Sequence, residues 1–241
     1  MSAELTEDTL FNGKVAVTQY KTGYRFSVDA VLLAGFVTLK PQERLLDLGC
    51  GCGVISLICA HRHQTVRIIG CELQKALATL ARANVHMNGF GDRVRIHHCD
   101  MRNLTQKETG GAMDVIVCNP PYYPKASGRM NLNHQKTMAR HEIGIRLPEL
   151  LAVVRSHLKK GGRFYLIYPV NHLVRLLGRM RESAVEPKTI RMIHSTLNTS
   201  AKLALVCGKA GAKPGLISAA PLTVYDAEGS YTEEVRALFD E

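Results

Sequence analysis

Residues 45–54 read LLDLGCGCGV, an apolar run that ends in three glycines at alternate positions. The run Leu45–Leu48 has the length and composition of a buried strand, and the apolar segment Val54–His61 has those of a helix. Glycine tolerates positive φ, so the chain can turn sharply here and its backbone can approach a ligand, while the first turn of the helix leaves N–H groups unpaired. The stretch predicts a ligand-binding turn between a strand and a helix.

The glycine spacing separates this turn from a dinucleotide-binding loop. Gly49, Gly51 and Gly53 fall as G-x-G-x-G, and Asp47 stands two positions before the first of them. Dinucleotide sites carry G-x-G-x-x-G, in which the pyrophosphate rests on the start of the helix. A different ligand is therefore expected, although a tight turn without any ligand has the same local signals.

The alternation of strand and helix continues along residues 44–210. Short apolar runs alternate with longer amphipathic segments, which is typical of a parallel sheet with helical crossovers. The further strands expected are Val66–Cys71, Val94–His97, Val115–Cys118 and Phe164–Tyr168, and the further helices are Gln74–Asn88, Leu147–Leu158 and His172–Glu182. After them, Thr189–His194 and Lys202–Gly208 are strand-like and lack room for a helix between them, which predicts an antiparallel hairpin.

Length and composition fit one soluble domain of 241 residues with two short extensions. We expect residues 44–210 to form the core domain, residues 1–43 to pack on it and partly close its ligand site, and residues 211–241 to form a C-terminal extension. The polar N-terminus lacks the features of a secretory signal, which predicts a cytoplasmic protein. The seven cysteines are scattered through apolar runs, so reduced core thiols are expected, without a disulfide framework or a metal site.

The chain carries a formal net charge of +10. Lysine and arginine side chains that neutralise phosphates release counterions, so this charge favours a polyanionic partner. A basic protein without a nucleic-acid role has the same composition, and charge alone leaves both interpretations open.

Carboxylates follow the second and third predicted strands. Glu72, before Leu73, ends one strand, and Asp100, before Met101, follows the next. Ligands of open α/β sheets bind at the carboxyl ends of the strands, where a glutamate can accept from two ribose hydroxyls. Taken singly, a glutamate opening a helix and an aspartate capping a turn are the commoner explanations.

The tetrapeptide Asn119, Pro120, Pro121, Tyr122 directly follows the predicted fourth strand. Prolines restrain φ and lack an N–H group, so the turn is rigid and its carbonyls are free to accept hydrogen bonds. The Asn119 side-chain oxygen and the Pro120 carbonyl can both accept from one –NH2 group. A proline-rich loop that only caps a strand is the alternative.

Six segments together resemble one family: YRFSVDAVLLAGF, LLDLGCGCGVISL, CEL, CDMRNL, NPPYYPKASGR and ARHE. They resemble the bacterial tRNA1(Val) (adenine37-N6)-methyltransferases, which are class I S-adenosylmethionine-dependent enzymes. The glycine turn and NPPY are shared by many amino-methyltransferases, whereas YRFSVDAVLLA and the SGR…ARHE loop are more specific to this family. The resemblance implies a Rossmann-like, seven-stranded, mostly parallel sheet that ends in the antiparallel hairpin, with a tRNA substrate.

The resemblance also assigns roles to residues. Asp47 is expected near the donor's amino group, Glu72 on its ribose, and Asp100 and Met101 at its adenine. The expected donor-binding residues are Arg25, Ser27, Asp47, Gly49, Cys50, Gly51, Gly53, Glu72, Leu73, Asp100, Met101 and Asn119. Asn119 and Pro120 would orient the target amine, and Tyr122 would stack on a base that has left its own stack.

The basic loop after the tetrapeptide suits contact with RNA. Phosphate contacts and base stacking need basic and aromatic side chains at the mouth of the pocket. The expected RNA-binding residues are Tyr123, Lys125, Arg129, Arg140 and His141. A solvated charged loop is the alternative.

Three other functions share part of this pattern. A glutamine-N5 protein methyltransferase presents an amide –NH2 to the same turn, but such enzymes carry an N-terminal helical domain, and about 43 residues precede the first predicted strand. A guanine-N2 rRNA methyltransferase more often has phenylalanine at the position of Tyr122. A non-enzymatic module that binds the donor and RNA should keep the glycines of the scaffold and lose the side chains of Asn119 and Tyr122, and both are present here. The sequence leaves open the particular nucleotide and whether the protein is a monomer or a weak dimer.

Overall fold

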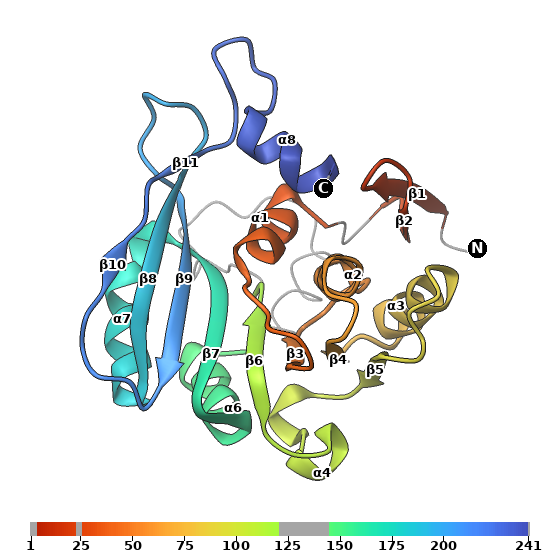
Figure 1. Ribbon diagram of the computed structural model, residues 1–241, viewed down its shortest axis with the longest axis horizontal. Coiled ribbons are helices and arrows are strands. Elements are labelled where there is room, and N and C mark those ends of the chain that lie inside the picture. Colours follow the sequence, from red (N-terminus) through yellow and green to blue (C-terminus); the bar gives the residue numbers. More distant parts are fainter. Residues whose placement is uncertain (1–3, 23–25, 121–144, 241) are drawn as a thin grey trace, which may run out of the picture.

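A computed structural model of the chain describes residues 4–22, 26–120 and 145–240 (Figure 1). Within these residues the centre is a nine-stranded sheet in the order β10-β8-β9-β7-β6-β3-β4-β5, with β11 paired to β8. The strands are β3 (Arg44–Leu48), β4 (Arg67–Glu72), β5 (Val94–His98), β6 (Met113–Cys118), β7 (Leu158–Pro169), β8 (Val185–His194), β9 (Leu203–Ala210), β10 (Ile217–Ser218) and β11 (Leu222–Thr223).

The five strands β3 to β7 are parallel neighbours, and β9 lies antiparallel between β7 and β8. This confirms the predicted fold class, a mostly parallel sheet that ends in an antiparallel hairpin. The two strands beyond the predicted seven, β10 and β11, have two residues each and pair with β8 in parallel. Strands this short have no periodicity from which a sequence could reveal them.

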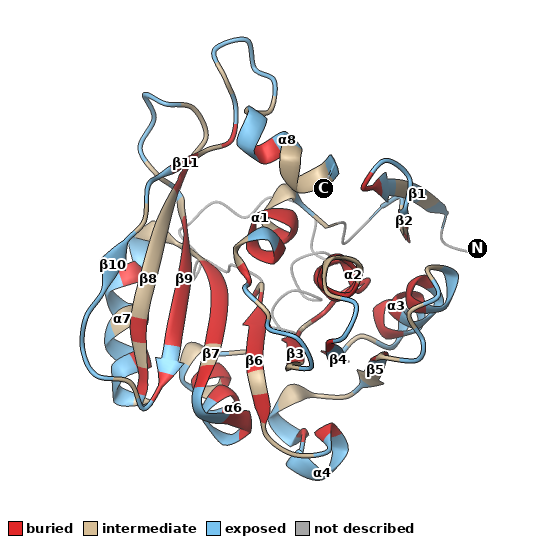
Figure 2. Ribbon diagram, in the orientation of Figure 1, coloured by how far each residue is buried: buried red, intermediate tan, exposed pale blue. Residues whose placement is uncertain are grey.

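Helices cover both faces of the sheet, so the central strands are buried on both sides (Figure 2). α1 (Val28–Phe36), α2 (Val54–Arg62) and α3 (Lys75–Met87) belong to one hydrophobic cluster, and α6 (Leu147–His157) and α7 (Leu173–Glu182) belong to the other. Leu45 enters the first cluster and Leu46 the second, because successive side chains of a strand point to opposite faces. A strand buried on both faces therefore reads as a continuous apolar run. No helix within the described parts of the chain is long and apolar enough to cross a membrane.

The N-terminal segment forms a separate hairpin of β1 (Leu5–Leu10) and β2 (Val15–Tyr20). Two asparagines, Asn84 of α3 and Asn88 directly after this helix, hydrogen-bond to the backbone of β2. The side chain of Asn84 accepts from the Thr18 N–H and donates to the Thr18 carbonyl, both at 2.9 Å. Asn88, one helical turn further on, makes the same pair of bonds with Ala16 at 2.9 and 2.7 Å. The i, i+4 spacing on the helix thus matches the i, i+2 spacing on the strand.

Asn84 is fully buried, and its Nδ2 also donates to the Cys52 carbonyl of the glycine turn at 2.9 Å. We expect Asn84→Ala to destabilise the protein by about 2–4 kcal/mol, because the change removes three hydrogen bonds, to the partly buried backbone of Thr18 and to the buried Cys52 carbonyl. Urea unfolding of Asn84→Ala and of the control Asn198→Ala, whose residue is exposed, measures this difference. A loss below about 0.5 kcal/mol would show that the hairpin is not held through this amide.

The C-terminal segment folds back over α1 through α8 (Glu233–Asp240) (Figure 1). The Phe11 N–H donates to the Phe239 carbonyl at 2.5 Å, which joins the two ends of the described chain. A side chain at Gly35 would clash with Leu238, since a Cβ there would lie 2.6 Å from Cδ2. A larger residue at this position would therefore require the Leu238 side chain to move.

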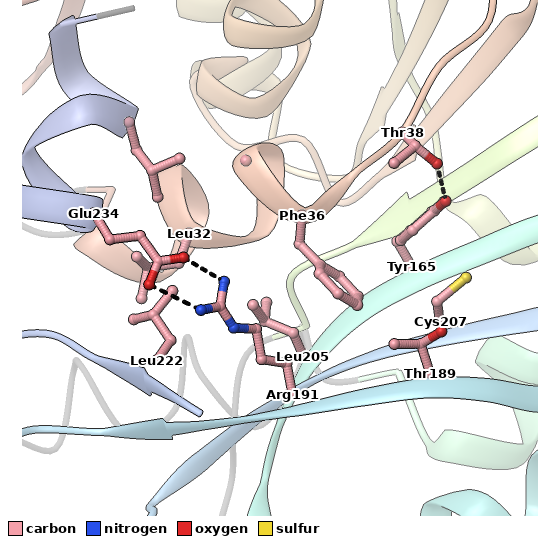
Figure 3. Close-up of a pocket in the computed structure, with 12 residues that line it drawn as sticks. Leu32, Phe36, Thr38, Tyr165, Thr189, Arg191, Leu205, Cys207, Leu222 and Glu234 are labelled. Atoms are coloured by element: carbon pink, nitrogen blue, oxygen red, sulfur yellow. Dashed lines mark hydrogen bonds and ion pairs between the residues drawn. The ribbon is translucent and has the colours of Figure 1, made fainter. Parts of the chain in front are cut away.

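A cleft of about 370 Å³ lies between α1, α8 and strands β7 to β9 (Figure 3). Its charged groups pair with each other, because Arg191 binds Glu234 at 2.6 Å and donates to the Ala220 carbonyl at 2.8 Å. The Thr38 and Tyr165 hydroxyls are hydrogen-bonded at 2.6 Å. The contacts of Arg191 fasten the C-terminal segment to β8, and the Thr38–Tyr165 bond joins the segment after α1 to β7.

Candidate active site

The glycine turn lies between β3 and α2. Gly49, Gly51 and Gly53 have φ values of +73°, +57° and +88°, which residues with a Cβ rarely adopt. The N–H groups of Gly49 and Cys50 both donate to the Cys71 carbonyl, at 2.8 and 3.1 Å. Burial raises the pKa of the Cys50 thiol well above its usual value, so Cys50 stays protonated and offers a ligand only its backbone.

Asp47 is fully buried beneath this turn. Its Oδ2 accepts a hydrogen bond from the Ser56 hydroxyl at 2.8 Å, whereas Oδ1 has no partner among the described residues. Desolvation raises the pKa of Asp47 to about 7, and the nearby charge of Glu72 contributes to the increase. A buried carboxylate oxygen without a donor is costly, so this site suits a cationic or N–H-bearing ligand.

Glu72 ends β4 and reaches across to the glycine turn. Its Oε2 accepts from the Gly51 N–H at 2.9 Å, and its Oε1 accepts from the Gln74 N–H at 2.8 Å. Each carboxylate oxygen has about two acceptor positions, so both can still accept from a ligand. Leu73, the next residue, is 37% exposed at the same edge.

Asp100 and Met101 follow β5. The Asp100 carboxylate caps the 3₁₀ helix Met101–Asn103 and accepts from the Arg102 side chain, with a closest contact of 2.5 Å. This hydrogen bond lowers the pKa of Asp100. The Met101 side chain lies against the glycine turn, because its Cε is 3.7 Å from the position of a Cβ at Gly49.

Asn119 and Pro120 directly follow β6, the strand that pairs with β3. Cys118 of β6 lies opposite Leu48 of β3 in the register, so both strands end at the same edge of the sheet. Asn119 is half-buried and Pro120 is buried. Ser27, another predicted donor-binding residue, occupies the N-cap position of α1 without a capping bond from its side chain.

The structure thus gathers Asp47, the glycine turn, Glu72 and Met101 by direct contacts, and it places Asn119 and Pro120 beside them through strand pairing. Several predicted residues lie outside the described residues and cannot be placed: Arg25, Tyr122, Tyr123, Lys125, Arg129, Arg140 and His141. Sequence reasoning missed Ser56 and Arg102. Their partners Asp47 and Asp100 were identified. Arg102 could have been found from its position two residues after Asp100, whereas nothing near Ser56 in the sequence indicates its bond to Asp47.

Cys71 and Cys99 place two thiols at this edge, with their sulfur atoms 2.9 Å apart. The hydrogen bond from the Cys71 thiol lowers the pKa of Cys99, whereas the same contact and burial raise the pKa of Cys71. Cys99 is also less buried than the other six cysteines.

We expect Cys99 to be alkylated first, because thiolates react and buried thiols do not. Iodoacetamide labelling at pH 7.5 with peptide mass mapping measures the order of reaction. Cys99→Ser should remove the fast phase, and Cys59→Ser, in the buried part of α2, should leave it unchanged. Fast labelling of any other cysteine in the wild-type protein would contradict the prediction.

The segments that form this edge of the sheet match the sequence pattern of a known family. The sequence pattern of the methyltransferase small domain matches residues 27–180, which include the glycine turn, the three carboxylates Asp47, Glu72 and Asp100, and Asn119. The chain belongs to the methyltransferase small domain family.

Curated relatives and solved structures agree with this membership. A tRNA1(Val) (adenine(37)-N6)-methyltransferase from Shewanella sp. strain MR-4 is 30% identical over 221 residues, which are 90% of each chain. A predicted O-methyltransferase from Agrobacterium tumefaciens superposes with a TM-score of 0.69 and 21% identity over 88% of this chain and 95% of that chain. Geranyl diphosphate C-methyltransferase from Streptomyces coelicolor, solved with S-adenosyl-L-homocysteine, gives a TM-score of 0.53 and 15% identity over 75% and 78% of the two chains. The two structures establish the class I methyltransferase fold for this family member.

Proposed function

We propose that this protein transfers a methyl group from S-adenosylmethionine to the exocyclic N6 of an adenine in RNA, most directly in tRNA near the anticodon. The observation that carries the proposal is the pairing of β3 with β6, which brings the glycine turn and the Asn119–Pro120 segment to one edge of the sheet. The name and coverage of the Shewanella relative support the adenine and the tRNA. We place the reaction in the cytoplasm.

The residues of this edge fit the methyl donor. The unpartnered Asp47 Oδ1 would face the donor's ammonium group, directly or through a water. Glu72, which keeps free acceptor positions, would bind the ribose hydroxyls, and Met101 would lie along the adenine. When bound, the donor supplies an electrophilic sulfonium methyl group.

Asp100 fits its proposed role less directly, because its carboxylate is already bound by Arg102. An adenine amino group would share this carboxylate with the guanidinium or displace it. Since the Arg102 side chain of this ion pair is exposed to solvent, which screens the charges, displacing it costs little.

Asn119 and Pro120 would orient the substrate. The lone pair of an adenine amino group is delocalised into the ring, so the group is a poor nucleophile. Two acceptors, the Asn119 Oδ1 and the Pro120 carbonyl, would bind its two N–H groups and draw the nitrogen towards tetrahedral geometry as positive charge develops. The methylated ammonium product is acidic enough to lose a proton to water, so the proposal needs no general base.

Tyr122 and the basic residues after it would hold the RNA. A base that has left its stack can lie on the ring of Tyr122, a contact worth about 1–3 kcal/mol. Tyr123, Lys125, Arg129, Arg140 and His141 would contact the neighbouring nucleotides and phosphates.

The product of the reaction tests the proposal. The protein is incubated with methyl-labelled donor and with total RNA or total protein, and the modified nucleoside or residue is identified by mass spectrometry. We expect N6-methyladenosine in the tRNA fraction. Label in N2-methylguanosine, or in protein glutamine alone, would replace the proposal by one of its two enzymatic rivals.

A further inference from the structure

A second hollow, of about 850 Å³, lies on the sheet face next to α4 (Gln106–Thr109), and it is strongly basic. Five basic side chains line it against two carboxylates. They are Arg44, Arg67, Arg93, Arg95 and Lys107, with Asp92 and Glu108. We call this hollow the basic groove.

The groove follows from the way helices cover the sheet. α3 packs on one face of β4 and β5, whereas on the other face, among the residues that the structure describes, the short helix α4 lies beside the start of these strands (Figure 1). On that open face, Arg67 and Ile69 of β4 lie beside Arg95 and His97 of β5. Continuing along each strand, the same face carries Cys71 and Cys99 and so leads to the proposed donor site.

The basic side chains of the groove fall into two groups. Arg44 and Arg93 are committed to the fold, because Arg44 donates to the Gly110 carbonyl at 2.9 Å and Arg93 to the Ala60 carbonyl at 2.7 Å. The second group is exposed, and within the described residues its side chains form no hydrogen bond or ion pair: Arg67, Arg95 and Lys107. Their charges are therefore available to a ligand.

We propose that the basic groove binds the ribose-phosphate backbone of the substrate tRNA at a distance from the target adenine. This inference rests on the proposed function. Guanidinium groups bind phosphate oxygens in a bidentate manner and without regard to base sequence. Glu72 lies five positions after Arg67 on β4, so at about 3.3 Å per residue the Arg67 position is roughly 17 Å from the donor site. An RNA stem that presents its loop to the site is long enough to reach it.

The double variant Arg67→Glu/Arg95→Glu tests the groove in the full-length protein. We expect it to weaken binding of tRNA and to raise KM for tRNA by about tenfold or more at moderate salt. Each phosphate contact releases counterions and changes the affinity by roughly threefold to fourfold over a fourfold range of salt concentration. The variant loses two such contacts. The slope of log affinity against log salt should fall by about 2. The value of kcat at saturating tRNA and the affinity for S-adenosylhomocysteine should stay unchanged.

Two further variants serve as controls. Arg175→Glu/Arg236→Glu makes the same change of net charge on α7 and α8, where both residues are exposed, and should leave KM within about twofold, because these positions lie outside the groove. Arg67→Lys/Arg95→Lys keeps the charge and should retain most of the affinity, which guards against an effect of misfolding. Thermal melting confirms that all variants fold.

An equal loss of affinity in both charge-reversed variants would overturn the proposal, because it would show a general effect of net charge. Unchanged tRNA binding in Arg67→Glu/Arg95→Glu would also overturn it and would leave an acidic protein as the partner to test. If the wild-type protein methylated no RNA, the proposed function and the groove assignment would fall together. An active wild-type enzyme with an unaffected groove variant would remove the groove assignment alone.

Discussion

Asn119→Ala is expected to lose almost all methyl transfer while the affinity for the donor stays within a few-fold of the wild type. Asn119 follows β6 at the edge where β3 ends in the glycine turn, so we assign its side-chain oxygen to the target amine. Removing one preorganised hydrogen-bonding group of this kind costs about 10²–10³ in kcat. Single-turnover methylation of tRNA measures the loss, and calorimetric titration with S-adenosylhomocysteine measures donor binding.

Asn119→Asp separates an accepting role from a purely structural one. A carboxylate oxygen can accept from the same N–H group as the Asn119 Oδ1, so this variant should retain more activity than Asn119→Ala. The exposed Asn198 of the β8–β9 turn provides a control, since Asn198→Ala should behave as the wild type. An undiminished rate in Asn119→Ala would reject the proposed orientation of the amine.

The local parts of this site could be predicted because short stretches of sequence encode them. LLDLGCGCGV specifies a strand, a turn that needs positive φ and a helix in ten consecutive residues, and the structure has β3, three glycines with positive φ, and α2 in this order. The predicted strands also match the parallel core, because a strand buried on both faces is apolar at every position.

Contacts between distant segments could not be predicted in this way. The hairpin of β1 and β2 was missed because LTEDTL has little apolar alternation and because β2 is bound by Asn84 and Asn88 from another part of the chain. In the sequence, both asparagines look like ordinary polar residues on the surface of a helix. The basic groove is likewise assembled from several strands and loops between residues 42 and 113, and no single window contains its charge.

Asp47→Asn is expected to make the free protein more stable at pH 8 and to weaken donor binding by about 100-fold. Asparagine keeps an oxygen for the Ser56 hydroxyl, but it cannot ionise in the buried site or neutralise an ammonium group. The pKa of Asp47 rises from 3.8 to about 7 on folding, mainly through desolvation. Between about pH 4 and pH 7 the folded protein thus holds a proton that the unfolded chain has released, so wild-type stability falls as the pH rises through this window.

The difference in stability between variant and wild type should therefore be near zero at pH 4 and should grow to at most about 4 kcal/mol above pH 7, at about 1.4 kcal/mol for each pKa unit. Urea unfolding at several pH values measures this change. Wild-type affinity for S-adenosylhomocysteine should increase with pH up to about 7 as Asp47 ionises, whereas the affinity of the variant should be flat over this range. A variant that is less stable at pH 8, or that binds the ligand as tightly as the wild type, would show that Asp47 is a structural residue. Greater stability with weaker binding would instead show that the chain maintains a buried charge for its ligand at the expense of its own fold.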